Sequence, residues 1–285
     1  MPSLPEIYQR YLRVLGIEGH PSGLDGLRAL VRAHLLGAPF ENVSKLLLFG
    51  REGRGRFFTL PEFLDGIEHR DLGGTCYGAN PFLADLLRAL GYDADLHGAN
   101  MPPRLNVHTS IRVRVDSRAY HVDVGYGGPF RDPIPLDRLP FEMVEGAHRY
   151  FLDRDPQGEG YEMAVSRGEE RVHGYIVHGA PRALEFFRPA MQNSFGSGAT
   201  FLNCLRICRF FDSHSVTLLN GSLSIHRGAL TTRRELHSVA EIESALADDF
   251  EMPRCPARAA IEIMEQVAGK PLFDAGAARA GPAGI

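Results

Sequence analysis

Apolar residues recur at steps of three and four positions through the first ninety residues of the chain. This spacing is typical of amphipathic helices, and a glycine close to the end of each segment suits a helix C-terminus. Three segments show the pattern: PEIYQRYLRVLGI, LDGLRALVRAHLLGA and NPFLADLLRALGY, with Gly16, Gly37 and Gly91 at their ends. The pattern therefore predicts a helical region over residues 1–94.

From about Asp95 the pattern changes to alternation, which is typical of half-buried strands. The segment VHTSIRVRVDSRAYHVDVGYGG alternates on both sides of Asp116 and Ser117 and predicts an antiparallel hairpin. YFLDRDPQGEGYEMAV and RVHGYIVHG continue this β region, which we expect over residues 95–195. Further strands (LRICRFF, SVTLLNGSLSIHRG) and a polar helix (SVAEIESALADDF) fall within residues 196–273. The Gly/Ala-rich tail, residues 274–285, is expected to be loosely held.

The composition is that of an ordinary soluble globular protein, with 285 residues, 44% hydrophobic and 23% charged. A formal net charge of -4 gives no basic stripe, so we expect neither nucleic acid nor an anionic membrane as a partner. No signal-peptide pattern and no membrane-length apolar run is seen, which predicts a cytoplasmic protein. The four cysteines include no CxxC pair, so we expect free thiols and no bound metal.

Cys76 stands out because it follows a Gly-Gly-Thr turn at the predicted start of a helix. Unpaired N–H groups and the positive dipole end of a helix favour a thiolate, which is a nucleophile. The same N–H groups are suited to stabilising an oxyanion when the thiolate attacks a carbonyl. The alternative is a buried cysteine that acts as a small apolar side chain.

A nucleophilic cysteine needs a base, and the base needs an orienting carboxylate. His108 begins the first strand of the predicted hairpin and Asp123 lies on the second, at nearly equal distances from the turn. A symmetric register places His108 almost opposite Asp123, although each alone is more often a structural polar residue. Other polar residues of the hairpin are interpreted as surface or edge positions: Arg112, Arg114 and His121.

At these residues the chain resembles the arylamine N-acetyltransferases. That family has a cysteine after Gly-Gly at a helix start, a strand histidine followed by a hydroxyl residue, and then Asp-Val-Gly-aromatic-Gly. It also has a histidine upstream of Pro-Phe-Glu-Asn. The matching positions here are Gly73, Gly74 and Cys76, then His108 and Thr109, then residues 123–127 (DVGYG), with His34 and residues 39–42 (PFEN) upstream.

The resemblance implies an α+β, multi-domain fold: a helical bundle (1–94), an antiparallel β-barrel (95–195) and an α/β lid (196–273), with a core like that of cysteine proteases. It implies acyl transfer from a coenzyme A thioester through Cys76, with His108 as base and Asp123 orienting it. Acetyl-coenzyme A would be the co-substrate, with no permanently bound cofactor. The acceptor would be an arylamine, hydrazine or N-hydroxyarylamine, and the enzyme a monomer or homodimer. The acceptor pocket would be lined by Phe40, Thr109, Gly125 and Tyr126.

Two positions depart from the family pattern. Leu72 stands where the family has an arginine before Gly-Gly, and Gly78 where it has a glutamate. The family arginine belongs to a charged network with the glutamate of Pro-Phe-Glu-Asn, here Glu41. We therefore expect Glu41 either to be solvated or to be reached by another cation, with Arg70 as the candidate. The connection HGANMPPRLN also supplies no aromatic residue to an arylamine pocket.

Three alternative functions stay open. An amide synthase-like acyltransferase of secondary metabolism would use the same residues. A papain- or transglutaminase-like hydrolase also orders its residues Cys, His, Asp, but HLLGAPFENVSK argues against it. A catalytically quiet ligand-binding relative would be supported only by Leu72 and Gly78, and the intact triad argues against it.

Overall fold

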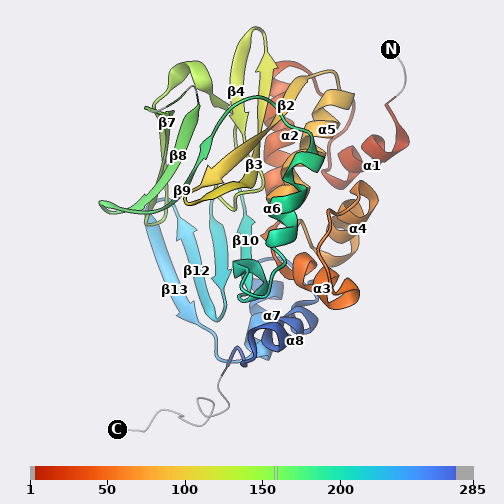
Figure 1. Cartoon of the computed structure of the whole chain (residues 1–285), viewed down its shortest axis with the longest axis vertical. Helices are drawn as coiled ribbons and strands as arrows, with labels where there is room; N and C mark the ends of the chain where they lie inside the picture. The colour runs from red at the N-terminus through yellow and green to blue at the C-terminus, as the bar shows by residue number, and fades with distance from the viewer. Residues whose placement is uncertain (1–3, 157, 159, 274–285) are drawn as a thin grey trace.

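A helical N-terminal part and two antiparallel sheets make up the computed structural model, which describes residues 4–156, 158 and 160–273 (Figure 1). The predicted tail, residues 274–285, lies outside the described residues. The helices of the N-terminal part are α1 (Glu6–Val14), α2 (Gly23–Gly37), α3 (Val43–Glu52), α4 (Leu60–Arg70) and α5 (Cys76–Ala89). The three predicted helices correspond to α1, α2 and α5, whereas α3 and α4 lie in a region for which only a helical period was expected.

The helix ends follow from local chemistry. Gly16 and Gly91 adopt positive φ angles of 67° and 90° just beyond α1 and α5, the conformation that glycine tolerates best. Thr59 caps α4 by accepting a hydrogen bond from the Glu62 N–H, and the Glu62 carboxylate accepts one from the Thr59 N–H. The apolar faces of α1, α2, α4 and α5 pack together and against strands of the first sheet.

The first sheet has eight antiparallel strands in the order β5-β4-β3-β2-β9-β8-β7-β6 and curls into a nearly closed barrel. Its strands are β2 (Asp93–Met101), β3 (Arg104–Val115), β4 (Arg118–Val122), β5 (Ile134–Pro135), β6 (Phe141–Glu145), β7 (His148–Arg154), β8 (Tyr161–Arg167) and β9 (Glu170–Val177). The predicted hairpin is confirmed as β3 and β4. Its two turn residues, Asp116 and Ser117, both have positive φ angles, which is typical of tight two-residue hairpin turns.

The second sheet has the order β1-β10-β11-β12-β13 and contains a strand from the helical part. Its strands are β1 (Phe40–Glu41), β10 (Arg206–Phe210), β11 (Ser215–Leu219), β12 (Ser222–Arg227) and β13 (Leu230–Glu235). Helices α7 (Val239–Asp248) and α8 (Ala257–Ala268) follow, and they share an apolar cluster with α3. Because β1 pairs with β10, the Pro-Phe-Glu-Asn segment ties the C-terminal sheet to the helical part.

A short helical stretch joins the two sheets: η2 (Leu184–Phe187), α6 (Arg188–Asn193) and η3 (Thr200–Leu202). A further 3-10 turn, η1 (Leu136–Arg138), follows β5. Figure 1 shows α6 between the eight-stranded sheet and the N-terminal helices. The helices of the described residues include none with the length and apolar character of a membrane span. The domain boundaries given by the sequence stay a prediction.

Candidate active site

Cys76 is the first residue of α5, as predicted, and its side chain is 9% exposed. The preceding turn depends on its glycines. Gly74 has a φ of 68°, and a Cβ on Gly73 would lie 2.3 Å from the carbonyl oxygen of Pro39. Only glycine therefore allows the chain to pass this close to the segment before β1. The turn presents the thiol at the N-terminus of a fourteen-residue helix.

His108 lies between Cys76 and Asp123. Its Nε2 is 2.7 Å from Asp123 Oδ2, while the Cys76 thiol is 4.0 Å from the Val107 carbonyl oxygen, on the residue before His108. Since Nε2 faces Asp123, the Nδ1 atom is the one left for the thiol. Burial alone would lower the pKa of His108. The charge and hydrogen bond of Asp123, together with the Cys76 side chain, instead raise this pKa above its ordinary value. Burial alone raises the pKa of Asp123, but the charge and hydrogen bond of His108 lower it.

The Asp123 carboxylate accepts four hydrogen bonds, two on each oxygen. Oδ2 accepts from His108 and from the Tyr175 hydroxyl at 2.7 Å, while Oδ1 accepts from Asn80 Nδ2 at 2.9 Å and from the Gly125 N–H at 3.0 Å. A buried carboxylate with this many donors has its charge stabilised and its orientation fixed. Asn80 and Tyr175 were not found by sequence reasoning, because neither belongs to a motif with Asp123.

His121 is fully buried, so its interpretation as a surface or edge residue is wrong. Its Nε2 lies 2.9 Å from the Tyr175 hydroxyl and its Nδ1 3.1 Å from the Tyr161 hydroxyl. Burial lowers the pKa of His121 to about 4, so the ring is neutral at pH 7. Because Asp123 can only accept, Tyr175 donates to it and in turn accepts from His121 Nε2–H, which assigns the tautomer.

The register of the hairpin differs from the symmetric one expected. Val115 pairs with Arg118 and Ile111 with Val122, so continuing this register brings Asp123 level with Ser110, two residues away from His108. The two-residue turn sets this register, in which His108 lies two residues away from the position opposite Asp123. Since residues i and i+2 share one face of a strand, His108 and Asp123 still meet as diagonal neighbours across the hairpin.

Glu41 is fully buried, and no cation among the described residues pairs with it, so both expectations for it are wrong. It is 0% exposed, and its oxygens accept the N–H of Gly74 at 2.6 Å and of Ser44 at 2.7 Å. Arg70 is exposed and does not reach it. Burial raises the pKa of Glu41, while its backbone hydrogen bonds oppose that rise. Leu72, in place of the family arginine, packs in the apolar cluster of α3, α7 and α8.

The four predicted pocket residues lie around Cys76 in different ways. A Cβ on Gly125 would be 2.6 Å from Cys76 Cα, so the Gly125 backbone packs directly on Cys76. Thr109 is fully buried and its hydroxyl donates to the Cys76 carbonyl at 2.8 Å. Phe40 packs beside Gly127, and the Tyr126 ring lies 5.6 Å from the His108 ring. Their acceptor-binding role stays a prediction.

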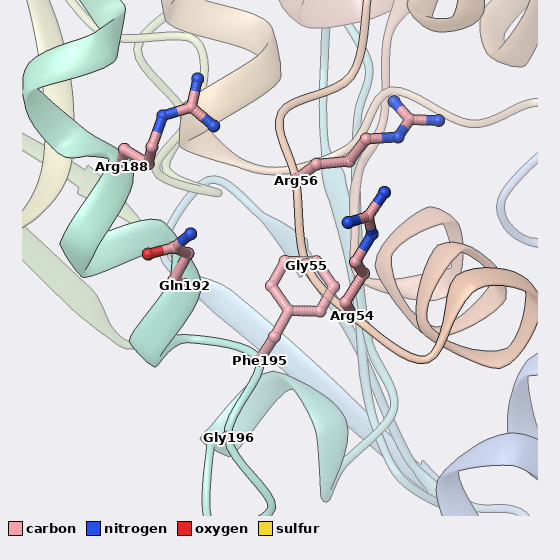
Figure 2. Close-up of a pocket in the computed structure, with 7 residues that line it drawn as sticks. All are labelled: Arg54, Gly55, Arg56, Arg188, Gln192, Phe195 and Gly196. Carbon is pink, nitrogen blue, oxygen red and sulfur yellow. The ribbon is translucent and has the colours of Figure 1, made fainter.

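Aromatic residues from other elements surround the site. The ring of Tyr77, next to Cys76, lies 6.0 Å from Phe187 and 5.9 Å from Phe57. A cavity of about 530 Å³ opens nearby between the α3–α4 connection and α6. Figure 2 shows the Phe195 ring lying against Gly55, with Arg188 and Gln192 from α6 on the other side. The cavity is lined by Arg54, Gly55, Arg56, Arg188, Gln192, Phe195 and Gly196.

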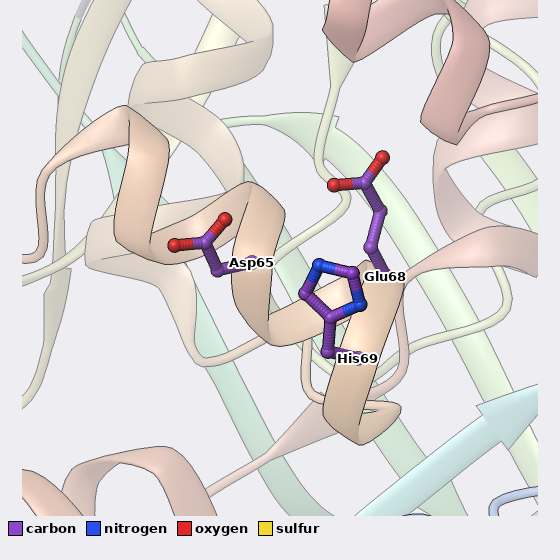
Figure 3. Close-up of side chains that lie close together, drawn as sticks. All are labelled: Asp65, Glu68 and His69. Atoms are coloured by element: carbon purple, nitrogen blue, oxygen red, sulfur yellow. The ribbon is translucent and has the colours of Figure 1, made fainter.

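A second group of polar side chains lies on α4, away from Cys76. Asp65, Glu68 and His69 come close together near the surface (Figure 3). Arg10 of α1 forms ion pairs with both Asp65 and Glu68. Because a cation of the chain already neutralises these carboxylates, the group is explained as a surface ion-pair network between two helices.

Comparison with known proteins gives the family. A family model described as N-acetyltransferase matches residues 23–254. The chain belongs to the arylamine N-acetyltransferase family. It is 27% identical over 255 residues to the arylamine N-acetyltransferase of Mycolicibacterium smegmatis, covering 84% of this chain and 90% of that protein. It is 29% identical over 169 residues to the N-malonyltransferase FDB2 of Fusarium pseudograminearum, covering 52% of this chain and 47% of that protein.

Solved structures of the family share the fold. The Nocardia farcinica arylamine N-acetyltransferase superposes with a TM-score of 0.76 at 24% identity, covering 92% of this chain and 95% of that chain. The Mycobacterium marinum enzyme in complex with CoA superposes with a TM-score of 0.75 at 23% identity, covering 91% of this chain and 99% of that chain. The predicted fold class and the predicted acetyltransferase class of enzyme are confirmed.

Proposed function

We propose that this enzyme moves an acyl group from a coenzyme A thioester to a small amine through an acyl-Cys76 intermediate. The observation that carries the proposal is the buried His108–Asp123 pair, with the Cys76 side chain contributing to the raised pKa of His108. Acetyl-coenzyme A is the expected donor, which the CoA complex of the Mycobacterium marinum relative supports. Arylamines, hydrazines and N-hydroxyarylamines are the expected acceptors. The FDB2 relative, an N-malonyltransferase, supports other acyl groups as donors too.

In the first half-reaction His108 takes the thiol proton and the Cys76 sulfur attacks the thioester carbonyl. The bond between the carbonyl carbon and the coenzyme sulfur then breaks. The leaving coenzyme thiolate takes the proton from His108, and acyl-Cys76 remains. Asp123 keeps Nε2 of His108 protonated and the ring oriented, so that Nδ1 carries out both proton transfers.

The tetrahedral intermediate needs hydrogen-bond donors for its oxyanion. The first N–H groups of a helix have no partner within the helix. In α5 the N–H groups of Gly78 and Ala79 already donate to the Thr75 carbonyl, at 2.9 and 3.0 Å. We therefore assign the oxyanion donors to the N–H groups of Cys76 and Tyr77.

In the second half-reaction an amine nitrogen attacks the acyl-Cys76 carbonyl. His108 takes a proton from the amine and the Cys76 sulfur leaves as the thiolate, which completes the cycle. A soft, readily expelled thiolate suits both steps. Phe40 and Tyr126 would flank the acceptor, because Phe40 lies beside Gly127 and the Tyr126 ring lies 5.6 Å from the His108 ring.

Steady-state kinetics test this proposal. With acetyl-coenzyme A and an arylamine varied together, release of the coenzyme thiol should give the parallel double-reciprocal lines of a ping-pong reaction. Intersecting lines would contradict an acyl-enzyme, because they require both substrates to bind before the first product leaves.

A further inference from the structure

Lys45 on α3 is a buried cation without a counter-ion. Its side chain is 6% exposed, and no carboxylate of the described residues forms an ion pair with it. The ammonium donates to Ser194 Oγ at 2.8 Å and lies 4.4 Å from the centre of the Phe195 ring and 5.9 Å from that of Phe201. An ammonium has three N–H donors, and burying it without an anion is costly. Nothing in the mechanism above uses this charge.

The turn of α3 that carries Lys45 is tied to the turn that precedes Cys76. Glu41 accepts the N–H groups of both Ser44 and Gly74, which clamps the first turn of α3 to the turn before Cys76. Burial lowers the pKa of Lys45 to about 8, whereas a negative charge on Cys76 opposes that shift. Lys45 is therefore still mainly protonated at pH 7, within electrostatic range of the nucleophile.

Aromatic rings shape the space around this ammonium. Phe201 packs edge to face on Phe40 at 5.9 Å, and Phe40 lies beside Gly127 in the predicted pocket. The Phe195 ring, which lies against the ammonium, also lines the cavity of Figure 2. An anion beside Lys45 would therefore lie in a mostly apolar environment, where a charge pair is stronger than in water.

We propose that Lys45 binds a carboxylate on the acyl group of the donor, so that the enzyme prefers thioesters of dicarboxylic acids, of the malonyl and succinyl type, to their uncharged counterparts. The proposal rests on the acyl-Cys76 step proposed above. In that step the Cys76 thiolate attacks the thioester carbonyl, the coenzyme sulfur leaves with the proton from His108, and the distal carboxylate does not react. Acylation removes the thiolate charge near Lys45, and the carboxylate of the acyl group replaces it.

A carboxylate on the acceptor amine has the same chemistry, but the acyl group fits the observations better. Lys45 and Cys76 are both nearly enclosed, at 6% and 9% exposure, and the two groups interact electrostatically. The acyl group takes part in both half-reactions and is bonded to Cys76 between them, whereas the amine arrives only after acylation. A buried cation can therefore stabilise the acyl-enzyme throughout its lifetime.

The test compares two thioesters of matched shape in the first half-reaction alone. Isovaleryl-coenzyme A has the shape of malonyl-coenzyme A without its charge. We expect the purified full chain to be acylated on Cys76 faster by the malonyl donor. Lys45→Met, an unbranched apolar replacement, should lower the malonyl-to-isovaleryl rate ratio at least about tenfold, as loss of a charge-assisted hydrogen bond predicts. Lys270→Met is the matched control, because Lys270 is exposed and is the only other lysine of the chain.

Three results would overturn the proposal. The first is faster acylation of the wild-type enzyme by the isovaleryl donor. This result does not depend on the folding of any variant. The second is an unchanged ratio in Lys45→Met. The third is a Lys45→Met effect seen only in the second half-reaction, as a lost preference for 4-aminobenzoate over aniline, which would assign the carboxylate to the acceptor. The two proposals fail separately: if none of the acetyl, malonyl and isovaleryl thioesters acylates Cys76, the proposed function itself is wrong.

Discussion

Tyr175→Phe removes one hydroxyl from the centre of the hydrogen-bond chain that runs from Tyr161 through His121 and Tyr175 to Asp123. Tyr175 donates to Asp123 Oδ2 at 2.7 Å, the same oxygen that holds His108. Its loss leaves Asp123 with three of its four donors and takes away the acceptor of His121 Nε2–H. The substitution therefore tests whether this series of hydrogen bonds supports His108 as a base or whether Tyr175 only packs inside the barrel.

The magnitude follows from the two hydrogen bonds lost. A hydrogen bond to a charged group contributes about 1.5–3 kcal/mol, and a buried unsatisfied donor costs about 1–3 kcal/mol. Tyr175→Phe should therefore lower the free energy of unfolding by roughly 2.5–6 kcal/mol. It should also slow acylation of Cys76 by about tenfold or more, the effect of about 1.4 kcal/mol on the barrier, because Asp123 is held less firmly behind His108.

Tyr161→Phe is the matched control, because Tyr161 reaches His121 but not Asp123. It should cost about 1–3 kcal/mol of stability, since neutral His121 loses the donor to Nδ1, and it should leave the acylation rate within about twofold of wild type. Urea unfolding and single-turnover acylation by acetyl-coenzyme A at pH 7 measure the two effects. Equal losses of rate in both variants, or no loss in either, would refute the reasoning.

Four further results are expected. His108→Gln and Asp123→Asn should each slow acyl transfer more than about a hundredfold; near wild-type turnover would remove that residue from the triad. Gly125→Ala should destabilise the fold by about 1–3 kcal/mol and slow acylation, because its Cβ would lie 2.6 Å from Cys76 Cα, whereas Gly198→Ala, with nothing within 4 Å, should change neither. The last result concerns pH and follows from the opposite pKa shifts of His108 and Asp123. The raised pKa of His108 gives stability present below pH 6.5 and lost as pH rises through its folded value. The lowered pKa of Asp123 gives stability present above pH 3.8 and lost as pH falls through its folded value. The difference in unfolding free energy between wild type and Asp123→Asn should therefore be largest between pH 3.8 and 6.5 and shrink on both sides; a difference that stays flat in urea titrations from pH 3 to 10 would contradict these directions.

Local pattern was enough to place Cys76 at a helix start and to bring His108 to Asp123. The Gly-Gly-Thr turn predicts the helix start at Cys76, and alternation around residues 116–117 predicts the hairpin that brings His108 to Asp123. These features depend on short stretches of chain whose geometry follows from glycine and strand periodicity.

The supports of the site depend on contacts between distant segments, which local pattern does not contain. Tyr175 reaches Asp123 from β9, 52 residues further along the chain, through a sheet order that the sequence does not reveal. His121 looks like an edge residue on its own strand and is buried only because β8 and β9 close over it. Glu41 was expected to need a cation, but backbone N–H groups, which carry no sequence signal, satisfy it instead.

Mapping of the acyl group tests the central claim most directly. The purified protein is incubated with acetyl-coenzyme A without an amine, digested, and its cysteine peptides are analysed by mass spectrometry. One acetyl group should appear on Cys76, because burial raises the pKa of the other three thiols, Cys204, Cys208 and Cys255, and keeps them protonated. The label should disappear when an arylamine is added and be absent in Cys76→Ala, which should unfold like wild type. Acetylation of Cys204, Cys208 or Cys255 in place of Cys76, or turnover without any acetylated cysteine, would contradict the account.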